Sequence, residues 1–279
     1  MSGRASLRLP DVLPYLAACL LVLPFVLPAL WALMASLSTN SEITLNALRP
    51  PSQLRFENYA YVWTEGDIGR FVGNSLVISV ASAILVALGA TLLGYALGRL
   101  EFPGRRLVLV VVFAAIALPV FAYLIPLTRT VRALHLPDAR LAVILATTAT
   151  FLPVPTLLMR SFFQTLPEEL ADAARVEGAS EWQVFQHIMA PLARPGILTA
   201  LIFAFVWAWN DVLLPVVFLQ SPDQFTVPYG IAALRPADFR QDYVSVFAAS
   251  IISTAPMVII WLFLQRRFVA GLTLGASKG

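Results

Sequence analysis

The chain has few charged residues. Lysine, arginine, aspartate and glutamate make up 13% of its 279 residues, whereas about 25% is usual for soluble proteins. Hydrophobic residues make up 59%, and the mean hydropathy is +0.79. This composition excludes a soluble globular domain and is typical of an integral membrane protein that is surrounded by a lipid bilayer.

Cysteine and histidine are also scarce. The single cysteine, Cys19, stands in an apolar run and has no second cysteine to pair with, so we expect an ordinary buried or lipid-facing side chain. The two histidines, His135 and His187, lie in or beside predicted loops and are expected at the surface. No His/Cys cluster has the spacing of a metal site, and no metal is predicted.

Catalytic and nucleotide-binding motifs are missing as well. The sequence contains neither a phosphate-binding loop of the form G-x4-G-K-[ST] nor a G-x-S-x-G nucleophile turn. The net charge of +3 is small, and no basic cluster alternates with aromatic residues, so nucleic acid is not an expected partner. We therefore expect a chain that is not an enzyme and binds no cofactor of its own.

Long apolar runs recur along the chain. Each is near the 20 residues that a helix needs to cross a bilayer, and none alternates with the period of a barrel strand. The predicted fold is all-α, a polytopic membrane protein with six transmembrane helices. The runs lie near residues 12–37, 71–98, 107–127, 141–159, 196–219 and 244–264.

Several of these runs contain proline, which kinks helices or breaks them across a cavity. The first run contains Pro24 and Pro28, is longer than a signal-peptide core and lacks a small-x-small cleavage site, so we interpret it as a retained helix. The other prolines inside runs are Pro119, Pro153, Pro155, Pro215 and Pro256.

Six spans place both termini on one side of the membrane. The short segments on that side carry most of their charge as arginine and lysine, with only Asp11 and Glu101 against them. By the positive-inside rule this side is cytoplasmic, although the opposite loops also contain arginines. The basic residues on this side are Arg4, Arg8, Arg99, Arg105, Arg106, Arg266, Arg267 and Lys278.

The longest cytoplasmic segment, about 160–195, gathers five of the sixteen acidic residues within fourteen positions. Thr165 and Glu168 have the spacing of a capping box, Pro167 suits a first helical turn, and Gly178 can end that helix in a left-handed conformation. The segment thus predicts a short helix and a sharp turn. The five acids are Glu168, Glu169, Asp172, Glu177 and Glu181.

A second short helix is predicted after the turn. Ser180 and Gln183 repeat the capping-box spacing. Trp182, Phe185 and Met189 then fall on one face before Pro191 ends the helix. This apolar stripe suits either the membrane surface or a groove on another protein.

The segment resembles the "EAA" loop of permease subunits in ATP-binding-cassette importers, in its Asp-Ala-Ala, the glycine four residues later and the proline that follows. Four further stretches, FENYAYVW, NSLVIS, WNDVLLPVVFL and the tail QRRFVAGLTLGASKG, resemble the binding-protein-dependent carbohydrate importers, in particular the shorter maltose-type permease. The resemblance extends over nearly the whole chain and implies a single transmembrane domain over residues 1–279.

The resemblance implies that the loop docks into a cleft of a cytoplasmic ATPase dimer, which binds ATP and magnesium itself. Two positions depart from the family pattern, because Asp172 replaces the usual glutamate and Glu177 the usual aspartate. The alternative is an ordinary solvated hairpin. The residues implied in docking are Glu169, Asp172, Ala173, Ala174, Glu177, Gly178, Ala179, Trp182, Phe185 and Pro191.

Two further contacts are implied by the resemblance. The tail, about 265–279, would reach the ATPases, although a polar, glycine-rich end is unstructured by default. The last outer loop, about 220–243, would meet an extracytoplasmic solute-binding protein, or would be a plain connection. The tail residues implied in contact are Gly271, Leu272, Thr273 and Gly275.

A solute path is predicted around Trp207, Asn210 and Asp211, because aromatic faces together with amide and carboxylate groups suit a polyhydroxylated ring. With Trp209 these residues spread around the helix, so they cannot all face one cavity. Hydrogen bonds to neighbouring helices are the alternative.

The sequence therefore predicts a permease subunit in a bacterial or archaeal cell membrane that pairs with a second permease and imports a sugar. An importer of the same architecture for glycerol-3-phosphate or a polyamine stays open. An ion-coupled secondary carrier is the alternative from another class. Several intramembrane carboxylates would be expected of such a carrier, and only Asp211 lies well inside a predicted span.

Overall fold

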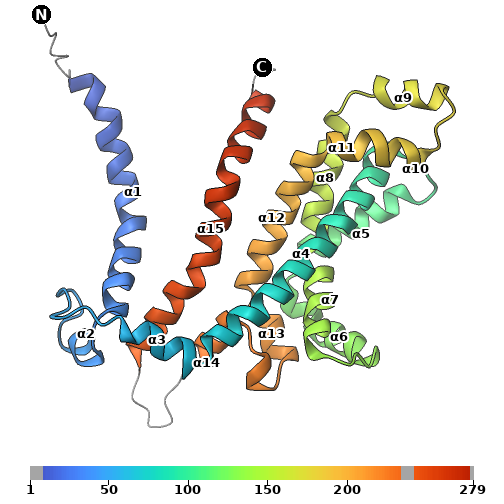
Figure 1. The fold of residues 1–279 in the computed structure, drawn as a ribbon. Coiled ribbons are helices and arrows are strands. Elements are labelled where there is room, and N and C mark those ends of the chain that lie inside the picture. Colours follow the sequence, from blue (N-terminus) through green and yellow to red (C-terminus); the bar gives the residue numbers. More distant parts are fainter. Residues whose placement is uncertain (1–8, 234–241, 277–279) are drawn as a thin grey trace, which may run out of the picture. The chain divides into compact units, whose positions relative to one another are not determined.

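The structure is a computed structural model that describes residues 9–233 and 242–276. Figure 1 shows helices joined by short links, and no strand occurs within the described ranges. The all-α prediction is confirmed. The chain divides into two compact units, Met1–Ile68 with Ile231–Ala255 and Gly69–Gly230 with Pro256–Gly279. The single transmembrane domain stays a prediction.

The helices follow one another with few long connections. In order they are α1 (Leu9–Ser36), α2 (Asn40–Asn46), α3 (Glu57–Thr64), α4 (Ile68–Arg99), α5 (Arg105–Ala117), α6 (Val120–Ala133), α7 (Ala139–Phe151), α8 (Pro153–Thr165), α9 (Glu169–Val176), α10 (Glu181–Val184), the π-helical turn η1 (Phe185–Met189), α11 (Ala190–Leu192), α12 (Arg194–Asn210), α13 (Leu213–Phe218), the 3-10 turn η2 (Pro222–Gln224), α14 (Val227–Ala233) and α15 (Tyr243–Ala276).

Three helices are long and apolar enough to cross a membrane by themselves, and three bent pairs bring the number of spans to as many as six in the described ranges. The first, second and sixth runs correspond to α1, α4 and α15. The other three predicted runs are not single helices. The third run bends by 112° between α5 and α6, and the fourth bends by 49° between α7 and α8. The fifth run covers α12 and α13, which are separate helices. The third bent pair, at 75°, joins the preceding helical segment Glu181–Leu192 to α12.

Proline explains two of the breaks. Leu118, which precedes Pro119, is extended at ψ 122°, the conformation that a following proline favours. The 13 residues of α5 therefore rise about 20 Å, less than the roughly 30 Å hydrocarbon core. Pro153 begins α8 after the second bend. In contrast, α1 passes through Pro24 and Pro28 as one helix.

Unit 1 uses the FENYAYVW stretch to hold the end of α1. The Tyr59 hydroxyl lies 2.6 Å from the Ser36 hydroxyl. The Asn58 amide donates to the carbonyl oxygens of Ser36 at 2.9 Å and Ser38 at 3.1 Å. Because the last carbonyls of a helix lack partners within it, these bonds complete the C-terminal end of α1.

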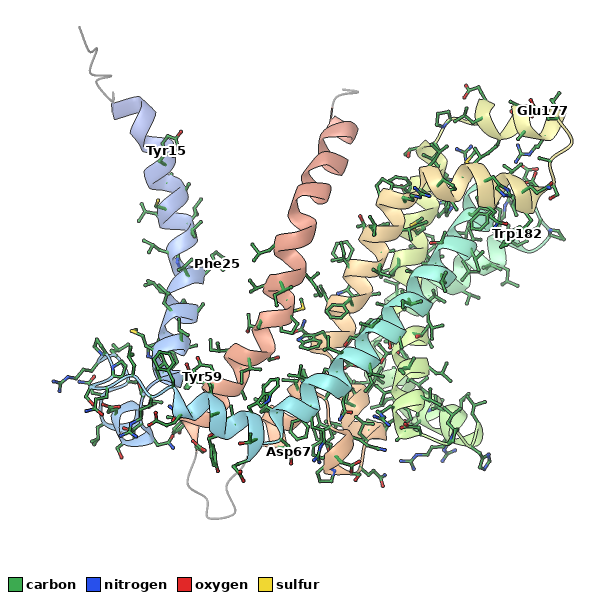
Figure 2. All side chains as sticks on the ribbon, viewed as in Figure 1. Tyr15, Phe25, Tyr59, Asp67, Glu177 and Trp182 are labelled. Atoms are coloured by element: carbon green, nitrogen blue, oxygen red, sulfur yellow. The ribbon has the colours of Figure 1, made fainter. Side chains whose placement is uncertain are left out.

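The described side chains of α1 are mostly exposed before this anchored end. Figure 2 shows Tyr15 and Phe25 projecting from the helix, and their exposed fractions are 74% and 82%. Large apolar side chains so exposed suit contact with lipid or with another membrane subunit.

Unit 2 is built on a close approach of α4 to α8. A Cβ added to Gly94 would lie 2.5 Å from the Met159 Cβ, and one added to Gly98 would lie 3.1 Å from the Arg160 carbonyl oxygen. Glycines four residues apart let two membrane helices touch backbone to backbone. Arg99 then donates to the carbonyl oxygen of Phe163 at 2.8 Å.

The end of unit 2 at the start of α4 is held by the NSLVIS stretch of that helix. The Asn74 amide donates to the carbonyl oxygens of Asp223 at 2.8 Å and Phe225 at 3.1 Å. The Ser75 hydroxyl accepts from the Val227 backbone nitrogen at 2.8 Å. These bonds fix the start of the predicted outer loop. Its residues 234–241 lie outside the described residues.

The C-terminal tail is helical along its described part, whereas a polar, glycine-rich end was expected to be unstructured. Helix α15 continues through Ala276, so the backbone of Gly271, Leu272, Thr273 and Gly275 is helical. Their side chains, and residues 277–279, lie outside the described part, and the contact with an ATPase stays a prediction.

The α4–α8 contact yields a test of the fold. Replacing Gly94 by alanine should lower the stability by about 1–3 kcal/mol, because the new Cβ overlaps Met159 and the helices must separate. The matched control is Gly73→Ala on the same helix, where a Cβ meets nothing within 4 Å. Thermal unfolding of the purified protein in detergent measures both, and equal midpoints for wild type and Gly94→Ala would contradict the close approach.

Candidate functional site

The segment between α8 and α12 forms two short helices with a tight turn, as predicted. Glu177 is the C-cap of α9, and Gly178 follows with a φ of +89°, in the left-handed region that favours glycine. The Ser180 hydroxyl caps α10 and accepts from the Gln183 backbone nitrogen at 3.4 Å, while the Gln183 amide oxygen accepts from the Ser180 backbone nitrogen at 2.8 Å. The predicted second capping box is confirmed.

The first predicted capping box is wrong. Thr165 is the last residue of α8, and its hydroxyl donates to the Phe162 carbonyl oxygen. The N-cap of α9 is Glu168, which forms no side-chain capping bond. Because Pro167 favours an extended Leu166, the chain leaves α8 first, and α9 begins later than the Thr165 spacing suggests. Pro167 accordingly precedes the helix and is not in its first turn.

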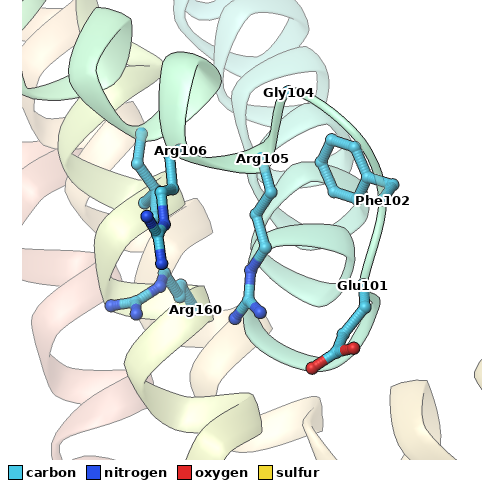
Figure 3. A pocket seen from close by; sticks show the side chains of 7 residues that line it. Glu101, Phe102, Gly104, Arg105, Arg106 and Arg160 are labelled. Atoms are coloured by element: carbon cyan, nitrogen blue, oxygen red, sulfur yellow. The ribbon is translucent and has the colours of Figure 1, made fainter.

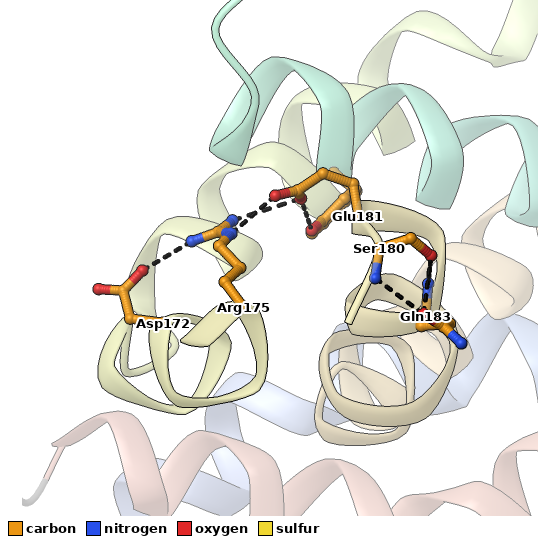
Figure 4. A network of polar contacts seen from close by, with 6 residues as sticks. Asp172, Arg175, Ser180, Glu181 and Gln183 are labelled. Atoms are coloured by element: carbon orange, nitrogen blue, oxygen red, sulfur yellow. Dashed lines mark hydrogen bonds and ion pairs between the residues drawn. The ribbon is translucent and has the colours of Figure 1, made fainter. Parts of the chain in front are cut away.

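Arg175 joins the two helices. Its guanidinium donates to Asp172 Oδ1 at 2.7 Å within α9 and to Glu181 Oε1 at 2.7 Å on α10 (Figure 4). The Tyr95 hydroxyl of α4 donates to Glu181 Oε2 at 3.2 Å. The hydrogen bond with Glu181 raises the pKa of the Arg175 guanidinium above its usual value. The turn is therefore closed by charge as well as by Gly178.

An apolar cluster lies beneath the two helices. Phe185 and Met189 are 8% and 0% exposed, and the Phe185 ring lies 5.0 Å from that of Tyr95. Ala174 and Ala179 pack against the same cluster. Of the predicted stripe of Trp182, Phe185 and Met189, Trp182 alone is exposed, and docking through the stripe stays a prediction. Two of its members are buried, because the π-helical turn directs this side of the segment onto α4 and α8.

The outward surface carries a different apolar set. Trp182 stays 60% exposed, and Leu170 and Val176 of α9 are 45% and 88% exposed. Ala173 is exposed between them. The sequence reasoning missed Leu170 and Val176. The helical period places Ala173 and Val176 roughly opposite Ala171, which packs inward, and this period signalled Val176. Leu170 lies one turn before the inward Ala174, at the edge of the outward face, so the period gave no signal for it.

The five acidic residues of the segment fall into two groups, those in ion pairs and those without one among the described residues. Asp172 and Glu181 pair with Arg175, and the Glu168 carboxylate lies 3.6 Å from Arg99 Nη1. Glu169 and Glu177 are exposed and take part in no ion pair within the described ranges. Figure 2 shows Glu177 at the turn. These two carboxylates, and not all five, are available to basic groups of a partner.

The segment continues into the membrane-spanning part. The helical chain ends at Leu192, one residue beyond Pro191 and close to the predicted end, and α12 starts at Arg194 after the 75° bend. Ala193, between them, is fully buried in the cluster beneath the two helices. A displacement of this segment therefore acts directly on the start of α12.

The predicted solute-path residues do not converge. The Asn210 amide donates to the Val206 carbonyl oxygen of its own helix at 2.8 Å, and Trp207 packs its ring against Phe203 and Phe151. Asp211 is not inside a helix. It lies between α12 and α13, where its Oδ1 accepts from the Leu213 backbone nitrogen at 2.9 Å. A solute path here stays a prediction.

Known proteins share this sequence and fold. The family described as "Binding-protein-dependent transport system inner membrane component" matches residues 90–274, which include the two short helices and the turn. The chain is 36% identical to the diacetylchitobiose uptake system permease protein NgcG of Streptomyces coelicolor, over 91% of this chain and 84% of that protein.

A second relative and a solved structure align with almost the whole chain. Identity is 34% with the sulfoquinovosyl glycerol transport system permease protein SmoH of Agrobacterium fabrum, over 99% of this chain and 97% of that protein. A crystal structure of a bacterial ABC transporter involved in the import of the acidic polysaccharide alginate contains a chain of the same fold. Its TM-score is 0.79 at 20% identity, with 96% of this chain and 99% of that chain covered.

The Arg175 bridge is testable by amide hydrogen exchange. In Arg175→Gln the ion pairs to both helices are lost, and we expect amides of residues 176–184 to exchange about two- to fivefold faster, since partly exposed pairs contribute about 0.4–1 kcal/mol. Arg194→Gln is the control, because Arg194 is exposed and has no ion pair in the described part of the chain. Unchanged exchange in Arg175→Gln would show that packing alone closes the turn.

Proposed function

This chain belongs to the binding-protein-dependent transport system inner membrane component family, and we propose that it is a permease subunit that imports a sugar or sugar-like solute, driven by separate ATPase subunits. The observation that carries the proposal is the outward surface of α9 and α10, with Leu170, Val176 and Trp182 exposed around unpaired carboxylates. Such a surface, large apolar side chains beside charge, fits a protein groove.

The solute class is supported by the relatives. Two permeases that share about a third of this sequence over most of its length are named for diacetylchitobiose and for sulfoquinovosyl glycerol, both of which contain a sugar ring. A sugar is therefore the preferred solute. Glycerol-3-phosphate and polyamines are the alternatives for the same architecture.

The two short helices and the turn between them, from Glu169 at the start of α9 to Leu192 at the end of α11, form what we call the coupling segment or coupling site, and its contacts suit the transmission of force. Three connections tie it to different helices of unit 2. The Tyr95 hydrogen bond to Glu181 reaches α4, the packing of Phe163 beneath the cluster reaches α8, and the buried Ala193 leads into α12. A partner that pulls on the outward surface would move these helices together, because the buried cluster between them is close-packed.

The proposed assembly follows from these assignments. The coupling site lies in the cytoplasm with both termini, on a cytoplasmic ATPase dimer that binds ATP and magnesium. A second permease completes the membrane part, in a bacterial or archaeal cell membrane. An extracytoplasmic solute-binding protein delivers the sugar to the outer loops. This chain contributes the force-transmitting surface and hydrolyses nothing.

Copurification tests the assembly. The tagged chain, extracted gently from its native membrane, should carry an ATPase with a phosphate-binding loop and a second multi-spanning permease, both identified by mass spectrometry. Glu177→Lys should reduce the ATPase about tenfold, because reversing an interfacial charge of this kind costs about 1.4 kcal/mol or more. Glu65→Lys, at an exposed carboxylate after α3, is the control.

Two negative results of the copurification would lead to different conclusions. If the chain is recovered alone or as a homodimer in every mild detergent, the proposed importer is wrong and an ion-coupled carrier replaces it. If the ATPase is recovered equally with Glu177→Lys, the importer stands but its docking surface lies elsewhere.

The turn at Gly178 gives a transport test. Gly178→Val should lower ATP-driven uptake about tenfold while ATP hydrolysis by the complex continues, because a β-branched residue in the left-handed region costs about 1–2 kcal/mol. No atom lies within 4 Å of an added Cβ, so only the backbone is strained. Gly178→Asn, which tolerates this region, should retain uptake. Normal uptake by Gly178→Val would refute this role of the turn.

A further inference from the structure

A cavity lies beside the turn between α4 and α5. Its volume is about 480 Å³, and it belongs to unit 2, where α8 forms its other wall (Figure 3). Arg160 in that wall lies five residues before the end of α8, and the coupling segment follows α8 along the chain. The lining residues are Glu101, Phe102, Gly104, Arg105, Arg106, Leu109 and Arg160.

Positive charge dominates the lining. Three guanidinium groups face one carboxylate, and no ion pair of Glu101 with any of them occurs among the described residues. Arg105 donates to the Leu97 carbonyl oxygen through Nη2 at 2.8 Å and Nε at 3.2 Å, and Arg160 donates to the same oxygen through Nε at 3.3 Å. A neutral carbonyl orients both groups but neutralises neither.

Arg106 is the third arginine of the lining, and no hydrogen bond to the described residues orients its side chain. Its side chain forms no hydrogen bond or ion pair with the residues that the structure describes, and Figure 3 shows its guanidinium directed toward that of Arg160. Like charges that face one another repel unless an anion lies between them. The arrangement therefore has the form of an anion site with two oriented guanidinium groups and one adaptable group.

The surroundings indicate where the anion comes from. Leu107, Val110 and Val111 of α5, directly after the arginines, are exposed by 67%, 62% and 58%. In a membrane protein such a face meets lipid. The cavity is thus placed where an apolar helix face meets a basic helix end, the level at which lipid headgroups lie.

We propose that this cavity binds a phosphate-bearing anion, through the guanidinium groups of Arg105, Arg106 and Arg160. The planar, forked guanidinium matches two phosphate oxygens at once. A phosphodiester of an acidic phospholipid and phosphate free in the cytoplasm share this chemistry. The bound anion would link the α4–α5 turn to α8 next to the coupling segment. The site does not depend on which solute the permease carries.

The experiment uses the transporter purified in detergent with its copurifying subunits and stripped of lipid. Native mass spectrometry counts bound phosphatidylglycerol and, separately, phosphatidylcholine, and calorimetry measures binding of inorganic phosphate. Arg106→Gln is the test variant, because Arg106 supports no other contact in the described structure. Arg132→Gln, at an exposed arginine of α6, is the matched control. Arg106→Lys keeps the charge and removes the fork.

We expect phosphatidylglycerol to bind more tightly than phosphatidylcholine, and Arg106→Gln to weaken it about fivefold, the contribution of one arginine near an anionic surface. Arg106→Lys should fall between, and Arg132→Gln should match wild type. If only inorganic phosphate binding weakens in Arg106→Gln, the site stands with a soluble ligand. If neither anion distinguishes Arg106→Gln from wild type and Arg132→Gln, the proposal is overturned.

Discussion

The rest of unit 2 depends on the backbone contact between α4 and α8. Gly94 and Gly98 bring the two helices close enough that a side chain at Gly94 would overlap the α8 backbone. Because the helices are this close, Tyr95 reaches Glu181 of the coupling segment, and Arg99 reaches the last carbonyls of α8. The coupling site is therefore positioned by a helix pair within the membrane and not by its own short helices, which are too short to be stable alone.

Electrostatics in the coupling segment serve two separate purposes. Arg175 holds Asp172 and Glu181 and so fixes the angle between α9 and α10. Glu169 and Glu177 take no part in that bridge and are exposed. The two departures from the EAA-loop pattern, at Asp172 and Glu177, agree with this division of the acidic residues. A shorter Asp172 still reaches Arg175 at 2.7 Å, whereas the longer Glu177 is exposed at the end of α9, where it takes part in no ion pair within the described ranges.

Local features of the site could be predicted from the sequence, and distant ones could not. The turn at Gly178 and the capping box at Ser180 depend on residues within four positions of one another, so their spacing was sufficient. The burial of Phe185 depends on Tyr95, ninety positions earlier, and no pattern within the loop reveals it. The six apolar runs were visible for the same local reason, but the break at Asp211 was not, because a carboxylate that caps the next helix looks like one inside a span.

The breaks between the helices of unit 2 separate three apolar clusters. One cluster, with Tyr95, lies under the coupling segment; a second, with Ile78, joins α6, α7 and α13; a third, with Val86, joins α4 and α12. Helix α4 contributes to all three without a break, while the chain bends by 49° between α7 and α8 and is extended at Asp211 between α12 and α13. A close-packed cluster moves as a unit, and a bend absorbs the change. In the importer proposed above, motion received at the coupling segment would pass to α6, α7 and α13 chiefly along α4, whose glycines, Asn74 and Tyr95 each hold a different part of the unit.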